Sequence, residues 1–228
     1  MSYQMIHMEI AFHLLHRFPG IFSHAEFIVG SIAPDSVHMN PNYDVSLKVA
    51  SHLFEGCGEW SDTQDYERWN RNITEFWHKY WSHARTKEEK SFIAGICVHC
   101  FTDYSNDLYI WRKLQKENIP PMTLEEFRQA YYPEAKGIDQ WLYQNSEHRS
   151  EIKELLAVGH TFEIGDLLNA EQIELQRQHL LHVQYDTEII DISKYRFLSG
   201  QKIIEFIEHT VNAIEEVLTK SIAEKYQK

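Results

Sequence analysis

Apolar residues recur at helical spacing along nearly the whole chain of 228 residues, and strict alternation of polar and apolar residues is absent. Apolar side chains three and four residues apart lie on one face of a helix, whereas a half-buried strand needs alternation. Only nine Gly and six Pro interrupt this pattern, and no internal repeat, low-complexity tract or linker divides the chain. The sequence therefore predicts an all-α fold, a multi-helix bundle formed by a single domain over residues 1–228.

Capping and helix-breaking residues indicate where the helices begin and end. Ser23 is a good N-cap for the second helix, which Pro34 ends. Thr123, with Glu126 three residues later, forms a capping-box pattern. Proline and glycine at 41, 56 and 58 predict an irregular segment over 35–60. The predicted helices are Met5–Phe18, Ser23 to the residue before Pro34, a helix from Asp62, Lys87–Lys116, a helix from Thr123 followed by shorter stretches to Gly159, Ile164–Tyr185 and Ser199–Tyr226.

The chain is strongly acidic, with 22 Lys and Arg against 34 Asp and Glu, a formal charge of −12. Such a surface repels phosphate backbones and anionic headgroups, which disfavours nucleic-acid binding through a basic face and membrane binding by charge. No apolar run is long enough for a transmembrane helix, and the first twenty residues lack the pattern of a signal peptide. With only three cysteines, we expect a cytoplasmic protein. The sequence does not indicate the oligomeric state.

The segment SFIAGICVHCFTDYSNDLYIW, residues 91–111, is apolar enough for a central helix and contains polar residues one turn apart. His99 and Asp103 share a face, with Gly95 one turn before them and Asp107 one turn after. Burying such a stripe is costly without partners, and a divalent metal is a suitable partner for imidazole and carboxylate. The glycine would let another backbone or an ion approach. A hydrogen-bonded His–Asp pair that only supports the core is the alternative.

Three further residues of the ligand type lie in apolar surroundings in the first quarter of the chain. His7 is on the first predicted helix, Asp35 follows Pro34 at the end of the second, and His52 lies in the short apolar stretch VASHLFEG. A single histidine on an apolar face is usually a core residue, but several together with His99 and Asp103 favour a shared metal ion.

The order of these residues resembles the zinc-dependent phospholipase C and S1/P1 nuclease superfamily, and within it the bacterial zinc-dependent phospholipase C-like proteins. The matching pieces are His7, GSIAPD ending at Asp35, His52, and GICVHCFTD with His99 and Asp103. They cover roughly the first half of the chain. The resemblance implies a helical bundle of that type in which Asp35, His52, His99 and Asp103 surround one zinc ion. It further implies that Asp103 bridges to a second zinc ion held by His7.

In that family the second ion is completed by a free, processed N-terminal residue. This chain begins six residues before His7 and lacks a signal peptide, so we do not expect that ligand to be reproduced. His38 or His24 are candidate substitutes, and one ion instead of two is the alternative. Other divalent transition metals than Zn²⁺ also suit imidazole and carboxylate ligands.

A third zinc site of the family finds no clear counterpart. Tyr109 stands where the resemblance implies a histidine. The remaining His-x-x-x-Asp pattern is His182 with Asp186, preceded by His179 on the same predicted helix face, and it would require an inserted helical hairpin. These three are weak candidate ligands, and a polar helix face is the alternative.

The resemblance and the ligand types together imply a zinc-dependent phosphoric ester hydrolase that cleaves a phosphodiester with a metal-activated hydroxide. Asp35 would orient or deprotonate the water, and Asp107 would hold an imidazole tautomer. The acidic charge favours a small soluble substrate over a packed lipid surface. The alternatives are a non-catalytic helical protein with a degenerate metal or ligand site, and a helical protein with only polar core networks. Cys97 and Cys100 fall mid-helix and are predicted to be buried structural thiols.

Overall fold

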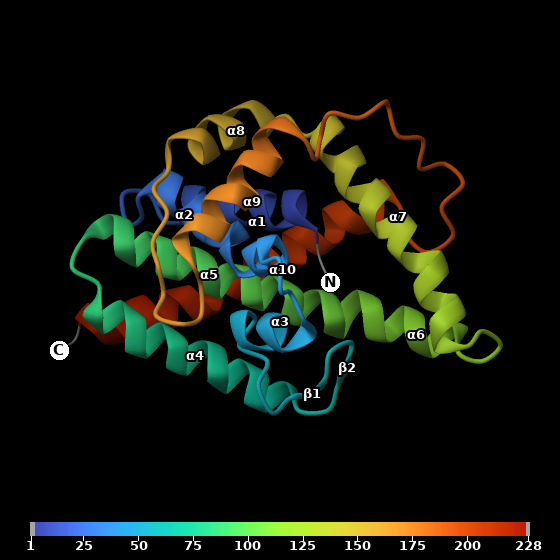
Figure 1. The fold of residues 1–228 in the computed structure, drawn as a ribbon, viewed down its shortest axis with the longest axis horizontal. Coiled ribbons are helices and arrows are strands. Elements are labelled where there is room, and N and C mark those ends of the chain that lie inside the picture. Colours follow the sequence, from blue (N-terminus) through green and yellow to red (C-terminus); the bar gives the residue numbers. More distant parts are fainter. Residues whose placement is uncertain (1–2, 227–228) are drawn as a thin grey trace.

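The computed structural model describes residues 3–226 and consists of helices plus one short hairpin (Figure 1), which confirms the predicted all-α class. Two short segments depart from α-helix, the 3₁₀ helix η1 and the π-helical segment η2. The elements are α1 Gln4–Arg17, α2 His24–Ile32, η1 Ala33–Met39, α3 Val45–Ser51, β1 Gly58–Glu59, β2 Asp62–Thr63, α4 Tyr66–His83, α5 Lys87–Asn106, η2 Asp107–Trp111, α6 Arg112–Asn118, α7 Leu124–Asn145, α8 Arg149–Val158, α9 Ala170–His182 and α10 Gly200–Tyr226. None of the described helices has the length and apolar character that a membrane span requires.

The central element is α5, which runs through the middle of the molecule with α4 alongside it and α1 and α2 on its other side (Figure 1). Every residue from 91 to 103 is buried. A capping box formed by Thr86 and Glu89 begins the helix. The predicted single helix to Lys116 is instead α5, η2 and α6 in direct succession, because the chain widens into a π turn at Asp107–Trp111. Such turns are frequent at functional sites.

Several local predictions are confirmed and others are wrong. Thr123 and Glu126 form the predicted capping box. Ser23 precedes α2, but its hydroxyl bonds to the Glu26 carboxylate and does not cap the helix. The segment predicted to be irregular contains η1, the two-turn helix α3 and β1. Cys97 and Cys100 are buried, as predicted, and burial raises the pKa of both thiols.

Helices α2 and α5 cross with their backbones in contact at Gly30 and Gly95. A Cβ atom on Gly95 would lie 2.3 Å from the Phe27 carbonyl oxygen and 2.8 Å from Gly30 Cα. Gly95 thus admits a neighbouring backbone, one of the two roles expected for it. The close crossing brings the carbonyl oxygen of Ser31 to 2.7 Å from Nδ1 of His99, one turn after Gly95.

Gly95→Ala is expected to lower the free energy of unfolding by about 2 kcal/mol. Forcing a methyl group against a helix backbone costs about 3 kcal/mol, while the better helix propensity of alanine returns about 1 kcal/mol. Urea unfolding followed by circular dichroism measures the difference. Gly137→Ala in α7 is the matched control, because there the added methyl group meets only the tip of the Tyr195 side chain. Equal losses in the two variants would refute the close-crossing argument.

Candidate metal centre

His99 lies on the buried face of α5 with its ring orientation fixed by one backbone contact. Its Nδ1 lies 2.7 Å from the carbonyl oxygen of Ser31, and a carbonyl oxygen can only accept a hydrogen bond. Nδ1 therefore carries a proton and donates it to this hydrogen bond. When the ring holds only this proton, its lone pair is on Nε2, where it can bind a metal ion.

His52 follows the last residue of α3 and is completely buried. Asp44 begins that helix by accepting a hydrogen bond from the Ser46 N–H, and the His52 carbonyl accepts one from the Trp69 indole at 2.9 Å. The Ser51 hydroxyl lies 3.2 Å from the Lys48 carbonyl oxygen and 2.9 Å from His52 Nδ1. When the hydroxyl donates to the carbonyl, its oxygen accepts from Nδ1–H, and the lone pair of His52 is then on Nε2.

The two Nε2 atoms of His52 and His99 meet at 3.1 Å. In the tautomers that carry Nδ1–H on both rings, two lone pairs face each other at this distance and repel, and a cation between them removes the repulsion. His52 Nε2 also lies 3.2 Å from Asp35 Oδ1 and 3.4 Å from Asp103 Oδ2. Ligands about 2.0–2.1 Å from a tetrahedral zinc ion are separated by about 3.3 Å. The donor set and its spacing therefore fit a zinc ion.

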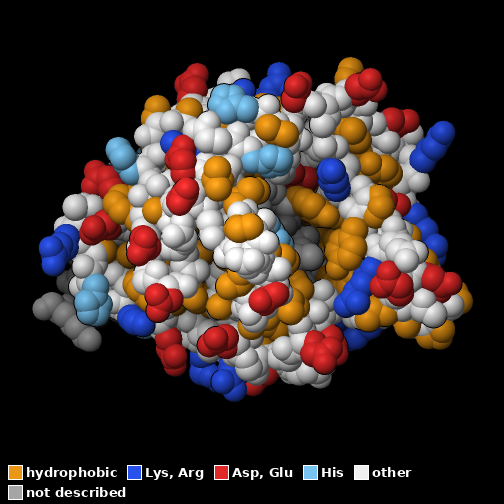
Figure 2. Space-filling view, in the orientation of Figure 1, with side chains coloured by type: hydrophobic (Ala, Val, Ile, Leu, Met, Phe, Trp, Pro, Cys, Tyr) orange, Lys and Arg blue, Asp and Glu red, His pale blue; other side chains and the backbone are white. Residues whose placement is uncertain are grey.

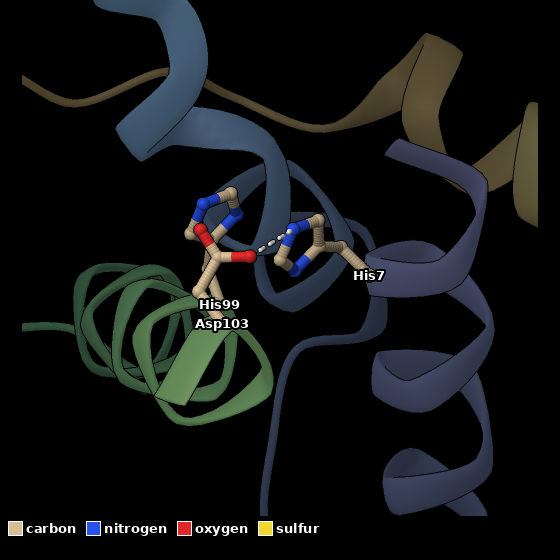
Figure 3. Close-up of side chains that lie close together, drawn as sticks. All are labelled: His7, His99 and Asp103. Carbon is tan, nitrogen blue, oxygen red and sulfur yellow. Dashed lines mark ion pairs between the residues drawn. The ribbon is translucent and has the colours of Figure 1, made fainter. Parts of the chain in front are cut away.

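His7, from α1, points toward His99 and Asp103 of α5 (Figure 3). The two rings stack with centroids 3.7 Å apart, and His7 Nε2 lies 3.6 Å from Asp103 Oδ1. Within residues 3–226 neither ring nitrogen of His7 has a hydrogen-bond partner, although the side chain is fully buried. Burial and the neighbouring His99 ring lower the pKa of His7 well below 6.5, so the ring is neutral. A buried neutral imidazole with no partner is suited to ligate a metal ion.

All five residues predicted as ligands thus come together, from α1, η1, the end of α3, and α5. Among the described residues they form two overlapping triads that share His99. The first triad is His7, His99 and Asp103, and the second is Asp35, His52 and His99. The 3.4 Å contact between His52 and Asp103 joins them.

Two residues that contact Asp35 were not predicted from the sequence. The Lys48 ammonium, with a side chain only 5% exposed, donates to Asp35 Oδ1 at 2.8 Å, and the Gln4 amide donates to Oδ2 at 2.6 Å. Lys48 also lies 5.2 Å from the centre of the Trp60 ring. A usable signal existed in the sequence, because Lys48 is one helical turn before His52 and Gln4 is one turn before His7.

Lys48 controls the charge of this side of the site. Burial alone would raise the pKa of Asp35, but the Lys48 ammonium and the neighbouring His52 ring hold that pKa well below 3.8. Burial would lower the pKa of Lys48, but Asp35 and Asp103 raise it above 10.5. Burial, followed by the Lys48 charge, lowers the pKa of His52 to about 4. Burial works against ionisation of Asp103 too, yet His7 and the other imidazoles lower its pKa to about 2. At neutral pH two carboxylates therefore face one ammonium, and a net negative charge remains for a metal cation.

His38 and Asp107 border the site without joining either triad. His38 Nε2 lies 3.2 Å from Lys48 Nζ and 3.6 Å from Asp35 Oδ1, with its side chain 40% exposed at the mouth of the site. Asp107 accepts a hydrogen bond from the Tyr66 hydroxyl at 2.6 Å. The predicted role of Asp107 in holding an imidazole is therefore wrong, since Ser31 and Ser51 hold the rings of His99 and His52. His24, the other candidate substitute ligand, is exposed at the start of α2.

Of the three weak candidates in the second half of the chain, Asp186 does not lie on the helix that carries His179 and His182. Helix α9 begins at Ala170, capped by Asn169, and ends at His182, so the predicted helix Ile164–Tyr185 is too long at both ends. Asp186 lies in the loop beyond it and is exposed, as is His182, while His179 is partly buried. No described group with the spacing of metal ligands includes any of the three. Tyr109, at the position of the missing histidine, is exposed and contacts the His209 ring.

A narrow pocket leads to Asp103 from the aromatic side of the site. Its walls are formed mainly by Trp60, Trp69, Trp111 and Tyr132. The space that it offers to water-sized molecules is about 20 Å³, room for one or two waters. Figure 2 shows the molecule hollowed near the centre of one face, with hydrophobic side chains along the wall of the hollow.

Comparisons of the chain with family models, with curated proteins and with solved structures found no match. The functional argument for this protein therefore depends on the chemistry of the buried site.

Proposed function

We propose that this protein is a metal-dependent phosphoesterase that uses one or two zinc ions to hydrolyse a phosphodiester, in the manner of the zinc-dependent phospholipase C and P1 nuclease type. The observation that supports it best is the 3.1 Å approach of the Nε2 atoms of His52 and His99, flanked by two buried carboxylates. A bound zinc ion would supply Lewis-acid chemistry, which polarises a phosphoryl oxygen and acidifies water.

The remaining roles belong to residues of the chain. The metal would be held by His52, His99, Asp35, Asp103 and His7. The depressed pKa of Asp35 keeps this carboxylate ionised, which suits a ligand or a hydrogen-bond acceptor for water better than a general base. Lys48 and Gln4 fix its two oxygens and so orient it.

Lys48 also bears on the choice of substrate. Its ammonium lies inside the site between Asp35 and the half-exposed His38, where a phosphoryl oxygen bound beside Asp35 would meet a positive charge. The narrow aromatic pocket limits how much of a substrate can reach Asp103. Together with the chain's acidic charge, these features favour a small soluble phosphodiester over packed anionic lipid.

Zinc is expected to raise the melting temperature of the metal-free protein by about 5–10 °C when its free concentration is 100 times the dissociation constant. Binding contributes about 2.7 kcal/mol under that condition, and a domain of this size gains about 2–4 °C per kcal/mol. The same zinc additions should switch on hydrolysis of bis(p-nitrophenyl) phosphate. Calorimetry and the release of nitrophenolate measure the two effects.

Chelation by EDTA is the control, and it should reverse both effects. Zinc binding without hydrolysis would leave the non-catalytic metal-binding alternative, which the tightness of the pocket favours. Failure to bind zinc at all would contradict the proposal and leave a polar core network. Faster turnover on anionic phospholipid vesicles than on the soluble ester would contradict the substrate class.

A further inference from the structure

A second group of metal-ligand side chains lies on α1, facing away from His7. Glu9 and His13 are one turn apart, and at 3.6 residues per turn both point roughly opposite to His7. His148, which immediately precedes α8, completes the group. One ligand atom from each of the three lies within 4.8 Å of those of the other two.

Glu9 is the unusual member, because its carboxylate is buried. The side chain is only 4% exposed. The Ser146 hydroxyl bonds to Oε1, and that same hydroxyl oxygen accepts the His148 N–H at 3.0 Å. The turn between α7 and α8 is thus folded around the carboxylate. The other oxygen, Oε2, lies 3.8 Å from His13 Nε2, too far for a hydrogen bond but near the separation of two ligands on one ion.

The two histidine rings are positioned beside this carboxylate by packing. The His148 ring stacks on the Phe12 ring with centroids 4.8 Å apart. The His13 ring packs edge to face against the His148 ring, with centroids 5.2 Å apart. The His13 side chain is 44% exposed, so its ring can rotate to close the remaining distance. A solvent-facing ligand also leaves one coordination position for water.

We propose that Glu9, His13 and His148 form a separate binding site for a divalent transition metal, Zn²⁺ in the first instance, which ties α1 to the turn between α7 and α8. Two imidazoles and one carboxylate favour zinc and its neighbours over Mg²⁺ or Ca²⁺, which prefer oxygen ligands. The site shares no residue with the buried triads and does not depend on the proposed hydrolase activity.

The test is the number of Zn²⁺ ions bound per chain, measured by equilibrium dialysis and elemental analysis. His13→Asn and Glu9→Gln should each bind one equivalent less than the wild type, whatever the total is. Replacing Zn²⁺ with Co²⁺ should give a visible absorption band from this site that both variants lose. His13→Asn is the variant least able to disturb folding, since the side chain is half exposed, and circular dichroism checks both.

His16→Asn is the matched control, because His16 is on the same helix but its ring bonds to the Phe12 carbonyl oxygen. His16→Asn should bind as many equivalents of Zn²⁺ per chain as the wild type. The inference is overturned if His13→Asn binds as much zinc as the wild type, or if His16→Asn loses the same amount. The buried triads are unchanged in all three variants, so a negative result for the Glu9 site does not bear on the proposed function. Conversely, a variant that loses zinc from the triads should still bind the ion at Glu9, His13 and His148.

Discussion

His99→Ala is expected to abolish tight zinc binding at the buried triads and to reduce phosphodiester hydrolysis by about a thousandfold or more. His99 is common to the two triads, and its single Nε2 lone pair can bind one ion, so the substitution removes a ligand from whichever triad holds that ion. Metal-assisted charge stabilisation is worth several kcal/mol of the activation barrier, and about 1.4 kcal/mol corresponds to a factor of ten. Zinc stoichiometry and kcat/KM for bis(p-nitrophenyl) phosphate measure the two losses.

His7→Ala should be measured beside His99→Ala. His7 belongs to one triad only, so this variant should keep the ion held by Asp35, His52 and His99, and should lose only an ion bound at His7 and Asp103. Asp103→Asn, which preserves side-chain volume, guards against a folding defect in the alanine variants. His78→Ala is the matched control, because His78 is exposed on α4 and belongs to neither triad. Full hydrolysis by His99→Ala without bound metal would end the proposal of a metal-dependent enzyme.

The helical class and the burial of the candidate ligands could be predicted from the sequence, because both are encoded in local patterns. Their convergence was expected from the order in which they occur along the chain and the family that this order resembles. Helical spacing follows from burial of one face, and ligand residues within apolar segments must be buried with those segments. The distances between the candidate ligands could not be predicted from the sequence. They depend on the crossing of α2 and α5 at Gly30 and Gly95, which brings Ser31 to His99 and fixes the ring.

The errors have equally specific causes. Lys48 was not predicted, because a lysine is not a metal ligand. The π turn at Asp107–Trp111 has no marker such as Pro or Gly, and it redirects Asp107 toward Tyr66. The end of α9 at His182 also lacks a Gly or Pro signal, and thus Asp186 was wrongly placed on the helix face.

Lys48→Met is expected to destabilise the metal-free protein by about 3 kcal/mol and, at the same time, to strengthen zinc binding by about tenfold or more. Removing one partner of a buried ion pair leaves the other charge uncompensated, here Asp35 with its side chain 9% exposed. The same removal frees Asp35 Oδ1 from an ammonium 2.8 Å away, which otherwise competes with and repels an incoming cation. Urea unfolding without metal and zinc titration calorimetry measure the two opposite effects.

The opposite signs separate this role of Lys48 from a merely structural one. A lysine needed only for folding would, when replaced, weaken both stability and zinc affinity. Lys153→Met is the matched control, because it removes the same charge from an exposed position on α8 and should change neither quantity. If Lys48 also contacts a phosphoryl oxygen, the zinc-loaded Lys48→Met protein should hydrolyse the ester more slowly despite holding its metal more tightly. Zinc affinity that is unchanged or lower in Lys48→Met would show that the ammonium is not a stand-in for the metal at Asp35.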